Sequence, residues 1–314
     1  METLNNKEHF LSCKTGVLIL SLISCGLWGS APTCIKLGYE FFQIGSADTM
    51  NIMLFAGMRF SLAGLMVILY FNITNKKFIV PGKQSWRAII PLSLSQTAVQ
   101  YFFYYIGVAN STGVKSSILS GSSSVISVLV ACFIFRQEKL TSNKAIGCIT
   151  GIIGIVLVNL QGSADAFSLE MSLTGEGFVL LSSVSGAVSA VLIRKFSQDE
   201  NPVMLSGWQF FTGGLMLCAV SLMCGGRLDN PCIEGFVILT HLAMVSAVAY
   251  TLRSILLKYN NVSSVTVYNF LIPIFGVVLA AVLLGEKESF TWMTFGAMLL
   301  ICMSIGIVNR SNKS

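Results

Sequence analysis

Residues 58–66, with the sequence MRFSLAGLM, return at residues 208–216 as WQFFTGGLM. The two stretches lie 150 positions apart, and each belongs to a long apolar segment. A second pair of tracts, 129–159 and 278–309, shares one order of features: an apolar run, a glutamate (Glu138 or Glu286) and then spaced glycines. Similarity at one fixed spacing over most of a chain predicts two copies of one structural unit.

The composition indicates that these copies lie in a membrane. Hydrophobic residues make up 54% of the chain and charged residues only 11%, whereas charged residues make up about a quarter of an ordinary soluble domain. Apolar runs of about 20 residues match the hydrocarbon thickness of a bilayer, and they recur with short polar breaks. We therefore predict ten spanning helices, at 15–37, 51–71, 88–109, 114–135, 142–161, 175–196, 203–224, 235–257, 262–284 and 290–308.

Five spans in each copy predict how the copies are oriented. An odd number of crossings makes the second copy enter the bilayer upside down relative to the first. We expect an all-α integral membrane protein, with a first repeat at 15–161 and a second, inverted repeat at 175–308 around a central pathway. Inverted repeats of this kind are typical of secondary transporters, whose substrate site lies near the bilayer midplane between the halves.

Basic residues predict which face is cytoplasmic. If the N-terminus lies inside, fourteen lysine and arginine residues fall in inner segments and four in outer ones. Such an excess marks the cytoplasmic side, so we expect both termini there, in the plasma (cell inner) membrane. The net charge of +6 then reflects topology. No surface element combines clustered basic residues with interleaved aromatics, so we expect no nucleic-acid partner.

Several motifs add to this pattern: LWGS at 27–30 with Ile35 and Lys36, MRF at 58–60, the turns at Glu138 and Glu286, and Pro273. Together, over 16–309, they resemble the EamA-like family of the drug/metabolite transporter superfamily. That family tends to carry a proline in the fourth helix of each repeat; Pro273 matches, whereas Val125 holds the equivalent place in the first copy. The resemblance implies ten helices around a central pathway and movement of small organic molecules, often outward. It implies no particular substrate.

Polar residues deep inside spans are the candidate site, because an unpaired charge or amide in hydrocarbon is costly. Arg59 lies midway along the second predicted helix, where it either meets an anionic substrate group or pairs within the bundle. Gln209 holds the equivalent place in the second repeat. Arg253 lies close to the cytoplasmic end of its helix, and we expect it to snorkel toward that interface.

Aromatic and amide side chains follow regular spacings in the third and later helices. Gln96, Gln100 and Tyr104 recur at intervals of four and predict one helix face. Such faces either pack tightly or line a cavity for an amphipathic or aromatic solute. Pro273 is expected to free the backbone carbonyl of Asn269. The predicted substrate-binding residues are Trp28, Arg59, Gln100, Tyr101, Tyr104, Trp208, Gln209, Tyr250, Tyr268 and Asn269.

Two rival functions can be weighed from the sequence. Because no metalloprotease, hydrolase or nucleotide-binding motif occurs, we expect neither an enzyme nor a cofactor or metal. A non-transporting sensor or assembly factor would favour long loops, but the longest break, 162–174, is short. The expected partners are therefore a small-molecule substrate and the lipid bilayer.

Three further features bear on mechanism and assembly. Every Asp and Glu falls in a break or at a helix end, which leaves His241 as the one titratable group near neutral pH within a span; we expect facilitated diffusion or exchange. Glu138 is expected to stabilise the amides at the start of the helix that follows it. The spacing of Gly147 and Gly151 predicts close helix packing, either within the bundle or in a homodimer.

Overall fold

A computed structural model of the chain describes residues 9–45, 47–76, 80–110, 119, 122–159, 172–228, 230–276 and 292–310. Within these ranges a helix lies at each of the ten predicted spans. The longer helices are α2 (Lys14–Phe41), α3 (Thr49–Asn75), α8 (Ser142–Asn159), α9 (Phe178–Phe196), α10 (Pro202–Met223), α11 (Ile233–Tyr259) and α14 (Trp292–Arg310).

The other spans change helix type along their length. The third is a continuous run of α4 (Trp86–Leu92), the π-helix η1 (Ser93–Val99) and α5 (Gln100–Ala109). The fourth joins α7 (Ser123–Leu129) to the π-helix η2 (Val130–Ile134), and the π-helix η4 (Leu173–Gly177) precedes α9. The ninth joins α12 (Val262–Thr266) to the 3₁₀-helix η5 (Val267–Leu271), directly before Pro273. The turn at Glu286 lies outside the described residues.

Helix length and surface composition identify a membrane protein. Five described helices are long and apolar enough to cross a bilayer, and four shorter apolar helices accompany them. Large apolar side chains are widely exposed on the outer faces of the bundle, for example Ile73, Ile149 and Leu222. Water would not favour so much exposed apolar surface, whereas lipid does.

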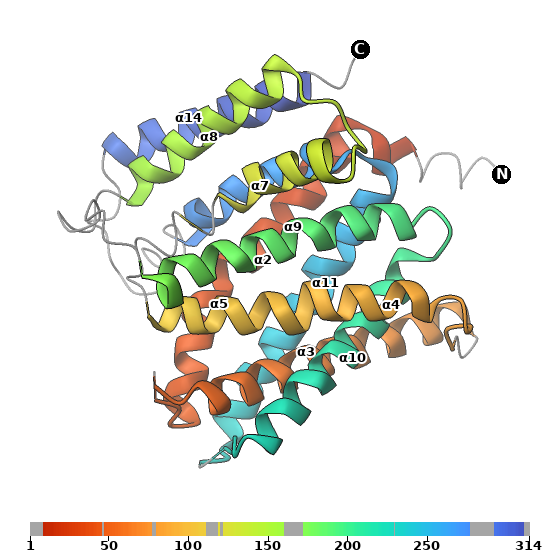
Figure 1. Ribbon diagram of the computed structural model, residues 1–314, viewed down its shortest axis with the longest axis vertical. Helices are drawn as coiled ribbons and strands as arrows, with labels where there is room; N and C mark the ends of the chain where they lie inside the picture. The colour runs from red at the N-terminus through yellow and green to blue at the C-terminus, as the bar shows by residue number, and fades with distance from the viewer. Residues whose placement is uncertain are drawn as a thin grey trace.

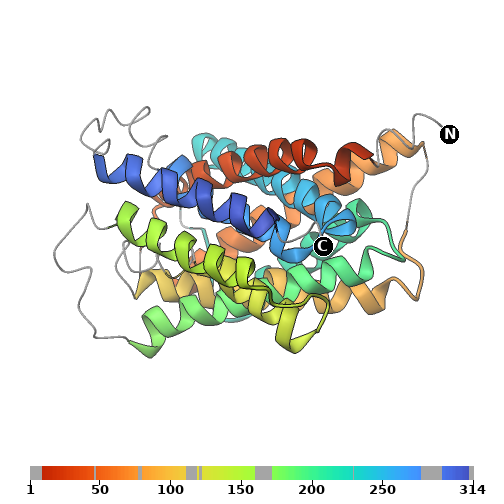
Figure 2. The same cartoon turned by 90° about the horizontal axis from the view of Figure 1, so that it is seen from above.

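The helices pair according to the predicted repeat. The second and seventh spans, α3 and α10, lie side by side at one end of the assembly, and the fifth and tenth, α8 and α14, lie side by side at the other (Figures 1 and 2). In between, α2 packs on α11, and α5 packs correspondingly on α9. Each of these contacts either joins two repeat counterparts or has a counterpart in the other half.

Glycines bring α3 and α10 into backbone contact. A Cβ atom on Gly64 would lie 2.6 Å from the carbonyl oxygen of Gly207, and one on Gly214 would lie 2.8 Å from the carbonyl oxygen of Gly57. At the repeat spacing of 150, Gly57 matches Gly207 and Gly64 matches Gly214, so the contact is reciprocal. Because the first glycine of each helix meets the second glycine of the other, the helices run antiparallel, as inverted repeats require.

The glycines of α8 serve a similar contact. A Cβ atom on Gly147 would lie 2.4 Å from a side-chain carbon of Val308, and Ser304 Oγ donates to the Gly147 carbonyl at 2.6 Å. A Cβ atom on Gly151 would lie 2.2 Å from the ring of Phe270. Of the two interpretations of this spacing, the structure shows packing within the bundle.

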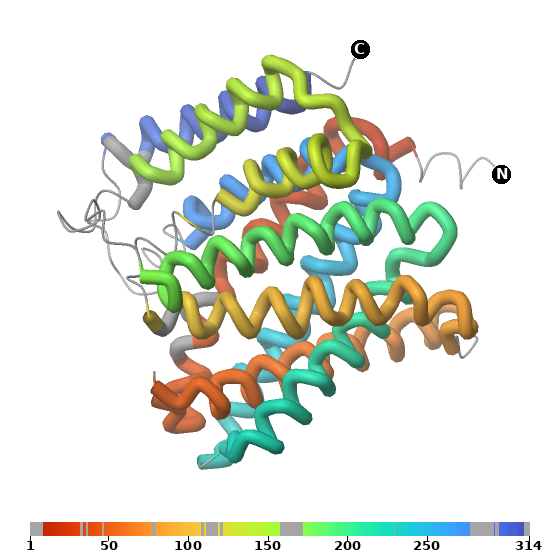
Figure 3. The backbone as a smooth tube through the Cα atoms, viewed as in Figure 1, coloured from red at the N-terminus to blue at the C-terminus, as the bar shows by residue number. Residues whose placement is uncertain are grey.

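The first and the last described helix have their chain ends on the same face of the bundle, the face that the helix ends form. The start of α2 and the end of α14 lie at the same end as the turns 136–141, 197–201 and 260–261 (Figures 1 and 3). We call this end the terminal face and the opposite end the distal face.

Candidate functional site

An aromatic cluster occupies the middle of the bundle. It consists of one side chain from each of five helices: Trp28 (α2), Phe60 (α3), Tyr101 (α5), Phe210 (α10) and Tyr250 (α11). The ring centroid of Phe60 lies 4.2 Å from that of Tyr101 and 5.6 Å from that of Phe210. Tyr250 lies 4.9 Å from Phe210 and 4.8 Å from Trp28, both edge to face. These are favourable aromatic geometries, and they join the two halves of the chain.

The cluster lies on the pseudo-twofold axis that relates the repeats. Phe60 and Phe210 are counterparts at a spacing of 150, and Tyr101 and Tyr250 are separated by 149 positions. The hydroxyls of Tyr101 and Tyr250 are hydrogen-bonded to each other. Two counterparts can touch in this way only where the axis passes between them.

Arg59 is buried beside the cluster, with 3% of its surface exposed. Its Nε donates to Ser246 Oγ of α11 at 2.9 Å, and its Cζ lies 5.3 Å from the centroid of the Phe60 ring. No carboxylate of the described residues forms an ion pair with it. A hydroxyl and a ring face are thus its neighbours in place of a counter-ion.

Gln209 makes the corresponding contact in the other half. Its Nε2 donates to Gln96 Oε1 at 3.0 Å, and its Oε1 accepts from Thr97 Oγ1 at 3.3 Å. Thr97 and Ser246 are separated by 149 positions, as Tyr101 and Tyr250 are. The two contacts are therefore repeat-related, but the cation is present only in the one that involves Arg59.

The third span does not keep the predicted face of Gln96, Gln100 and Tyr104 together. The π-helix η1 places Gln96 against α10, whereas Gln100 faces α9, where a Cβ atom on Gly186 would lie 3.1 Å from its Oε1. Tyr104 stays near the cluster, with its ring 6.2 Å from that of Tyr101. The wider π turn changes the angle between successive residues, so the spacing of four no longer defines one face.

One stripe of α11 carries the polar contacts of the site. Ser246, Tyr250 and Arg253 follow at intervals of four and three, which places them on one helix face. Ser246 meets Arg59, and Arg253 Cζ lies 5.5 Å from the centroid of the Trp28 ring. Trp28 lies fourteen residues beyond the start of α2, or about 21 Å along the helix axis. Arg253 therefore turns toward the middle of the bundle, and the prediction that it snorkels toward the terminal face is wrong.

A small pocket opens beside Arg253, on the terminal side of the cluster. It is lined by Ser21, Ser24, Cys25 and Trp28 of α2, Arg253 and Leu256 of α11, and Val265, Tyr268 and Asn269 of the ninth span. We call it the Arg253 pocket. Trp28 belongs to both, so the pocket and the aromatic cluster are neighbours.

The ninth span satisfies its own backbone at the pocket. Pro273 was expected to leave the Asn269 carbonyl free, but the N–H of Ile272 donates to it within the 3₁₀ turn. Cys25 Sγ donates to the Tyr268 carbonyl at 3.3 Å, and the Tyr268 hydroxyl accepts from Asn309 Nδ2 at 3.2 Å. Tyr268 and Asn269 line the pocket, and neither of their carbonyls is free.

The structure brings some of the predicted site residues together and separates others. Trp28, Arg59, Tyr101 and Tyr250 meet at the aromatic cluster, with Tyr104 at its edge; Tyr268 and Asn269 join Trp28 at the pocket. Gln100 and Gln209 face neighbouring helices, and Trp208 packs on Trp86 with centroids 5.8 Å apart. Sequence reasoning missed Phe60, Phe210, Ser246 and Arg253, although the repeated phenylalanine and the stripe on α11 were both legible.

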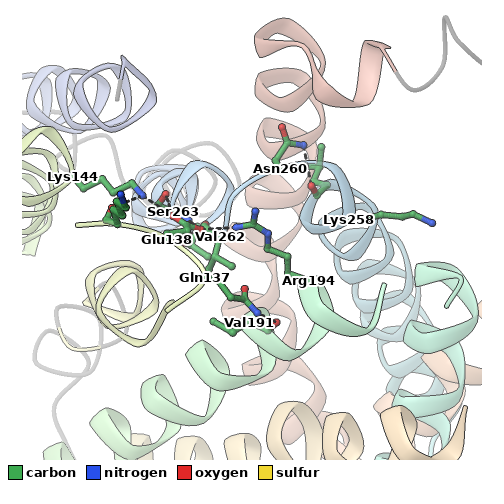
Figure 4. A network of polar contacts seen from close by, with 12 residues as sticks. Gln137, Glu138, Lys144, Val191, Arg194, Lys258, Asn260, Val262 and Ser263 are labelled. Atoms are coloured by element: carbon green, nitrogen blue, oxygen red, sulfur yellow. Dashed lines mark hydrogen bonds and ion pairs between the residues drawn. The ribbon is translucent and has the colours of Figure 1, made fainter. Parts of the chain in front are cut away.

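Glu138 holds a separate polar network at the terminal face (Figure 4). Its side chain is 2% exposed and accepts from Lys144 Nζ at 2.8 Å and from Arg194 Nη1 at 2.9 Å. Ser263 donates to it through Oγ at 2.5 Å and through its backbone N–H at 3.3 Å. The carboxylate was expected to cap the next helix, α8; the amide it accepts from instead begins α12, because the turn folds over the second repeat.

The pKa of Glu138 reflects these contacts. Burial of the carboxyl raises its pKa, but the hydrogen bonds from Lys144 and Ser263 and the charges of Lys144 and Arg194 outweigh burial, so the pKa lies below its ordinary value. The ionised form therefore links the first repeat to two elements of the second. Among the described residues, no group of three or more His, Cys, Asp or Glu side chains could hold a metal.

Comparison with known proteins identifies relatives along nearly the whole chain. An uncharacterized transporter of Synechocystis sp., sll0355, is 27% identical over 91% of this chain and 88% of its own length. An uncharacterized transporter of Archaeoglobus fulgidus is 25% identical over 91% of this chain and 92% of its own length. The uncharacterized inner membrane transporter YedA of Escherichia coli is 24% identical over 87% of this chain and 84% of its own length. A solved crystal structure shares the fold, with a TM-score of 0.76 over 96% of this chain and 100% of its own, at 15% identity.

The family assignment rests on both halves. The EamA-like transporter family matches residues 15–160 and again residues 173–310. The apolar helices, the antiparallel pairing of α3 with α10 and the aromatic cluster on the axis agree with a duplicated carrier fold. The chain therefore belongs to the EamA-like transporter family, and it is a multi-pass membrane transporter and not an enzyme.

Proposed function

We propose that the chain moves a small organic solute across the bilayer by alternating access between two repeats, 15–161 and 175–308, with the solute bound at the aromatic cluster. The observation that supports this most directly is the reciprocal contact of the repeats at the cluster, where Phe60 stacks on Phe210 and Tyr101 bonds Tyr250. A site on the axis is equally accessible to both halves, so a rocking motion can open it to either side.

Two contacts would have to open during that motion. The Tyr101–Tyr250 hydrogen bond closes the route at its centre. Glu138 closes the terminal face, because it ties the turn of the first repeat to Arg194 and Ser263 of the second. Opening toward the terminal face would break the Glu138 network, whereas opening toward the distal face would leave it intact.

Orientation follows from the distribution of basic residues. The terminal face carries Lys14, Lys76, Arg136, Lys139, Lys195, Lys258 and Arg310, among others. We place this face, and hence both termini, in the cytoplasm of a cell whose plasma (inner) membrane holds the chain. YedA, a relative, is named as an inner membrane transporter. Export is the proposed direction.

Coupling to a proton gradient is not part of the proposal. The acidic residues of the described chain lie in turns or near helix ends, and His241 is exposed on the outer surface of α11, away from the cluster. Facilitated diffusion or exchange therefore accounts for movement without a titrating group on the route.

The proposed transport unit is a single chain. The glycines that allowed a homodimer are covered by α14 and by Phe270, so they offer no surface to a second copy. The alternative reading, a sensor or assembly factor that does not transport, has no element that supports it in the described residues, because the connecting turns there are short.

A resistance screen followed by reconstitution tests the proposal. Overexpressing cells would be grown against a panel of toxic amino-acid analogues, carboxylates and drug-like solutes, and each hit would then be measured as efflux from loaded proteoliposomes. We expect saturable efflux that Phe60→Ala abolishes and that Tyr70→Phe, at a side chain 68% exposed, leaves unchanged. Saturable binding without flux would favour the sensor instead.

A further inference from the structure

We propose that the Arg253 pocket binds a carboxylate, and that the transported solute is a small organic carboxylate with an apolar body. The proposal rests on the transport function above and specifies its substrate class. It is supported by three observations: a half-buried cation that has no counter-ion among the described residues, a set of unused hydrogen-bond donors beside it, and an aromatic ring, Trp28, that the pocket shares with the aromatic cluster.

Arg253 has no partner for its charge in the described part of the chain. No hydrogen bond or ion pair reaches its guanidinium, whose close contact is the face of Trp28 at 5.5 Å. A cation–π contact contributes about 0.5–2 kcal/mol, and removing a charge completely from water without a counter-ion costs several kcal/mol. Arg253 is half-buried, so it bears part of that cost. The cost is recovered if an anion occupies the pocket during the transport cycle.

The neutral groups around Arg253 are hydrogen-bond donors. Ser21 Oγ and Trp28 Nε1 are buried and have no partner, and Ser21 is only 4% exposed. The hydroxyl of Tyr268, a lining residue, accepts from Asn309, so its own proton is not used in that hydrogen bond. No Asp or Glu is among the described residues that line the pocket. A carboxylate is an acceptor with two oxygens and can use a guanidinium fork and adjacent N–H or O–H donors together.

The number of charges favours a carboxylate over a phosphate group. One guanidinium neutralises one carboxylate in bidentate geometry, while a phosphate monoester carries close to two negative charges near neutral pH. Arg59, the buried arginine beside the aromatic cluster, contacts Ser246, which lies seven residues before Arg253 on α11. That is about 10 Å along the helix, too far for both arginines to grip one small anion.

The aromatic side chains beside the pocket indicate the chemistry of the part of the solute that lies away from the carboxylate. Trp28 bounds the pocket and touches Tyr250 of the aromatic cluster at 4.8 Å. A solute whose carboxylate lies at Arg253 would therefore extend its other end toward Phe210 and Tyr101. Those rings bury apolar or aromatic groups favourably, so the proposed cargo is amphipathic with one anionic end.

Direct binding measurements on purified protein in lipid nanodiscs test the assignment. The probes are 3-phenylpropionate, phenylethylamine, which has a similar body and the opposite charge, and inorganic phosphate. We expect 3-phenylpropionate to bind saturably, and both other probes to bind at least about tenfold more weakly. Equal binding of phenylethylamine or of phosphate, or no binding of 3-phenylpropionate, overturns the proposal.

Variants locate the carboxylate. Arg253→Gln should weaken the binding of 3-phenylpropionate at least about tenfold. The matched control Arg310→Gln, at an exposed residue in the last turn of α14, should leave the affinity unchanged. If Arg253→Gln does not fold, Ser21→Ala and Tyr268→Phe each remove one donor and should weaken binding about threefold or more. Unchanged affinity in a folded Arg253→Gln variant, or in both milder variants, rules the pocket out.

Flux separates this inference from the proposed function. Proteoliposomes that export phenylethylamine or another cation, but no carboxylate, would refute the carboxylate pocket and leave the transport function standing. Carboxylate binding that Arg253→Gln abolishes, in a chain that moves no solute of the panel, would support the pocket as a binding site and refute the proposed transport cycle, including the carboxylate as cargo.

Discussion

Phe60 stacks on Phe210, its own counterpart in the second repeat, with ring centroids 5.6 Å apart and ring planes 18° from parallel. Two residues 150 positions apart can meet in this way only if the repeats close around a common axis. The same pair lies between the glycines through which α3 contacts α10, so the packing of the fold and the proposed solute route share one structural element.

The first prediction concerns that contact. In Gly64→Ala, the new Cβ would lie 2.3 Å from the backbone nitrogen of Phe211, and backbone cannot yield cheaply. We expect a loss of about 1–3 kcal/mol in stability, measured as a lower midpoint of thermal unfolding in detergent. Gly296→Ala is the control, since nothing lies within 4 Å of a Cβ there. An unchanged midpoint for Gly64→Ala would mean that the helices are farther apart than described.

The second prediction concerns the central hydrogen bond. Tyr101→Phe and Tyr250→Phe each remove one hydroxyl of the pair, and the double variant should be no worse than either single one. We expect a coupling energy of about 0.5–3 kcal/mol in a double-mutant cycle of unfolding. Transport rate is the second measurement, because a weaker central closure should speed exchange. Additive effects on stability would show that the hydroxyls do not interact.

The third prediction concerns pH. Because the folded-state pKa of Glu138 lies below its ordinary value of 4.5, its contribution to stability is fully present above that value and is lost as the pH falls through the folded-state pKa. Glu138→Gln should cost about 3–5 kcal/mol near neutral pH, since it leaves Lys144 and Arg194 unpaired. It should also flatten the acid end of the stability curve. Glu40→Gln, at an exposed residue, serves as the control; a parallel acid slope in both variants contradicts the assignment.

The fourth prediction concerns energetics. Uptake into proteoliposomes should be insensitive to an imposed proton gradient, because, in the part of the chain that the structure describes, no acidic side chain lines the Arg253 pocket or belongs to the aromatic cluster. His241→Ala should leave the rate unchanged, since that side chain is exposed on the outer surface. Strong stimulation by a proton gradient would require a titrating group on the route and would defeat this account.

The fifth prediction concerns topology. Cys224 is an exposed free thiol at the distal end of α10 and should react with a membrane-impermeant maleimide added to intact cells. In a Cys224→Ser background, Lys76→Cys should react only after lysis, because Lys76 ends α3 at the terminal face. Labelling of both sites from the same side would contradict the inverted arrangement.

The fold was largely predictable because its determinants are repeated in the sequence. The stretch MRFSLAGLM and its echo contain both Phe60 and Gly64, together with their counterparts, and these residues form the contact between the halves. The position of Arg59 deep within a spanning helix was equally predictable, since it depends only on counting residues into an apolar run.

The site was less predictable because side-chain direction is not set by spacing alone. Gln100 was assigned to the face of Gln96, but the π turn of η1 separates them, and no periodicity in the sequence reports a π turn. Arg253 was expected to follow the general preference of a cation near a helix end. The ring of Trp28, 225 positions away in the chain, gives it a partner in the opposite direction.

Each repeat carries one arginine of the route, but at positions that are not counterparts, and this makes the two entrances of the route unlike. The counterpart of Arg59 is Gln209, and the counterpart of Arg253 is Tyr104, so neither arginine is repeated. Arg59 lies on α3 and Arg253 on α11, and these two helices pack together. An anionic solute that enters from one face therefore meets the two arginines in the opposite order to one that enters from the other face, although the backbone is symmetric. Duplication supplied a reversible hinge, and one arginine in each copy, at positions that do not correspond, makes its two entrances differ in affinity, while the gradient of an uncoupled solute still sets the net flow.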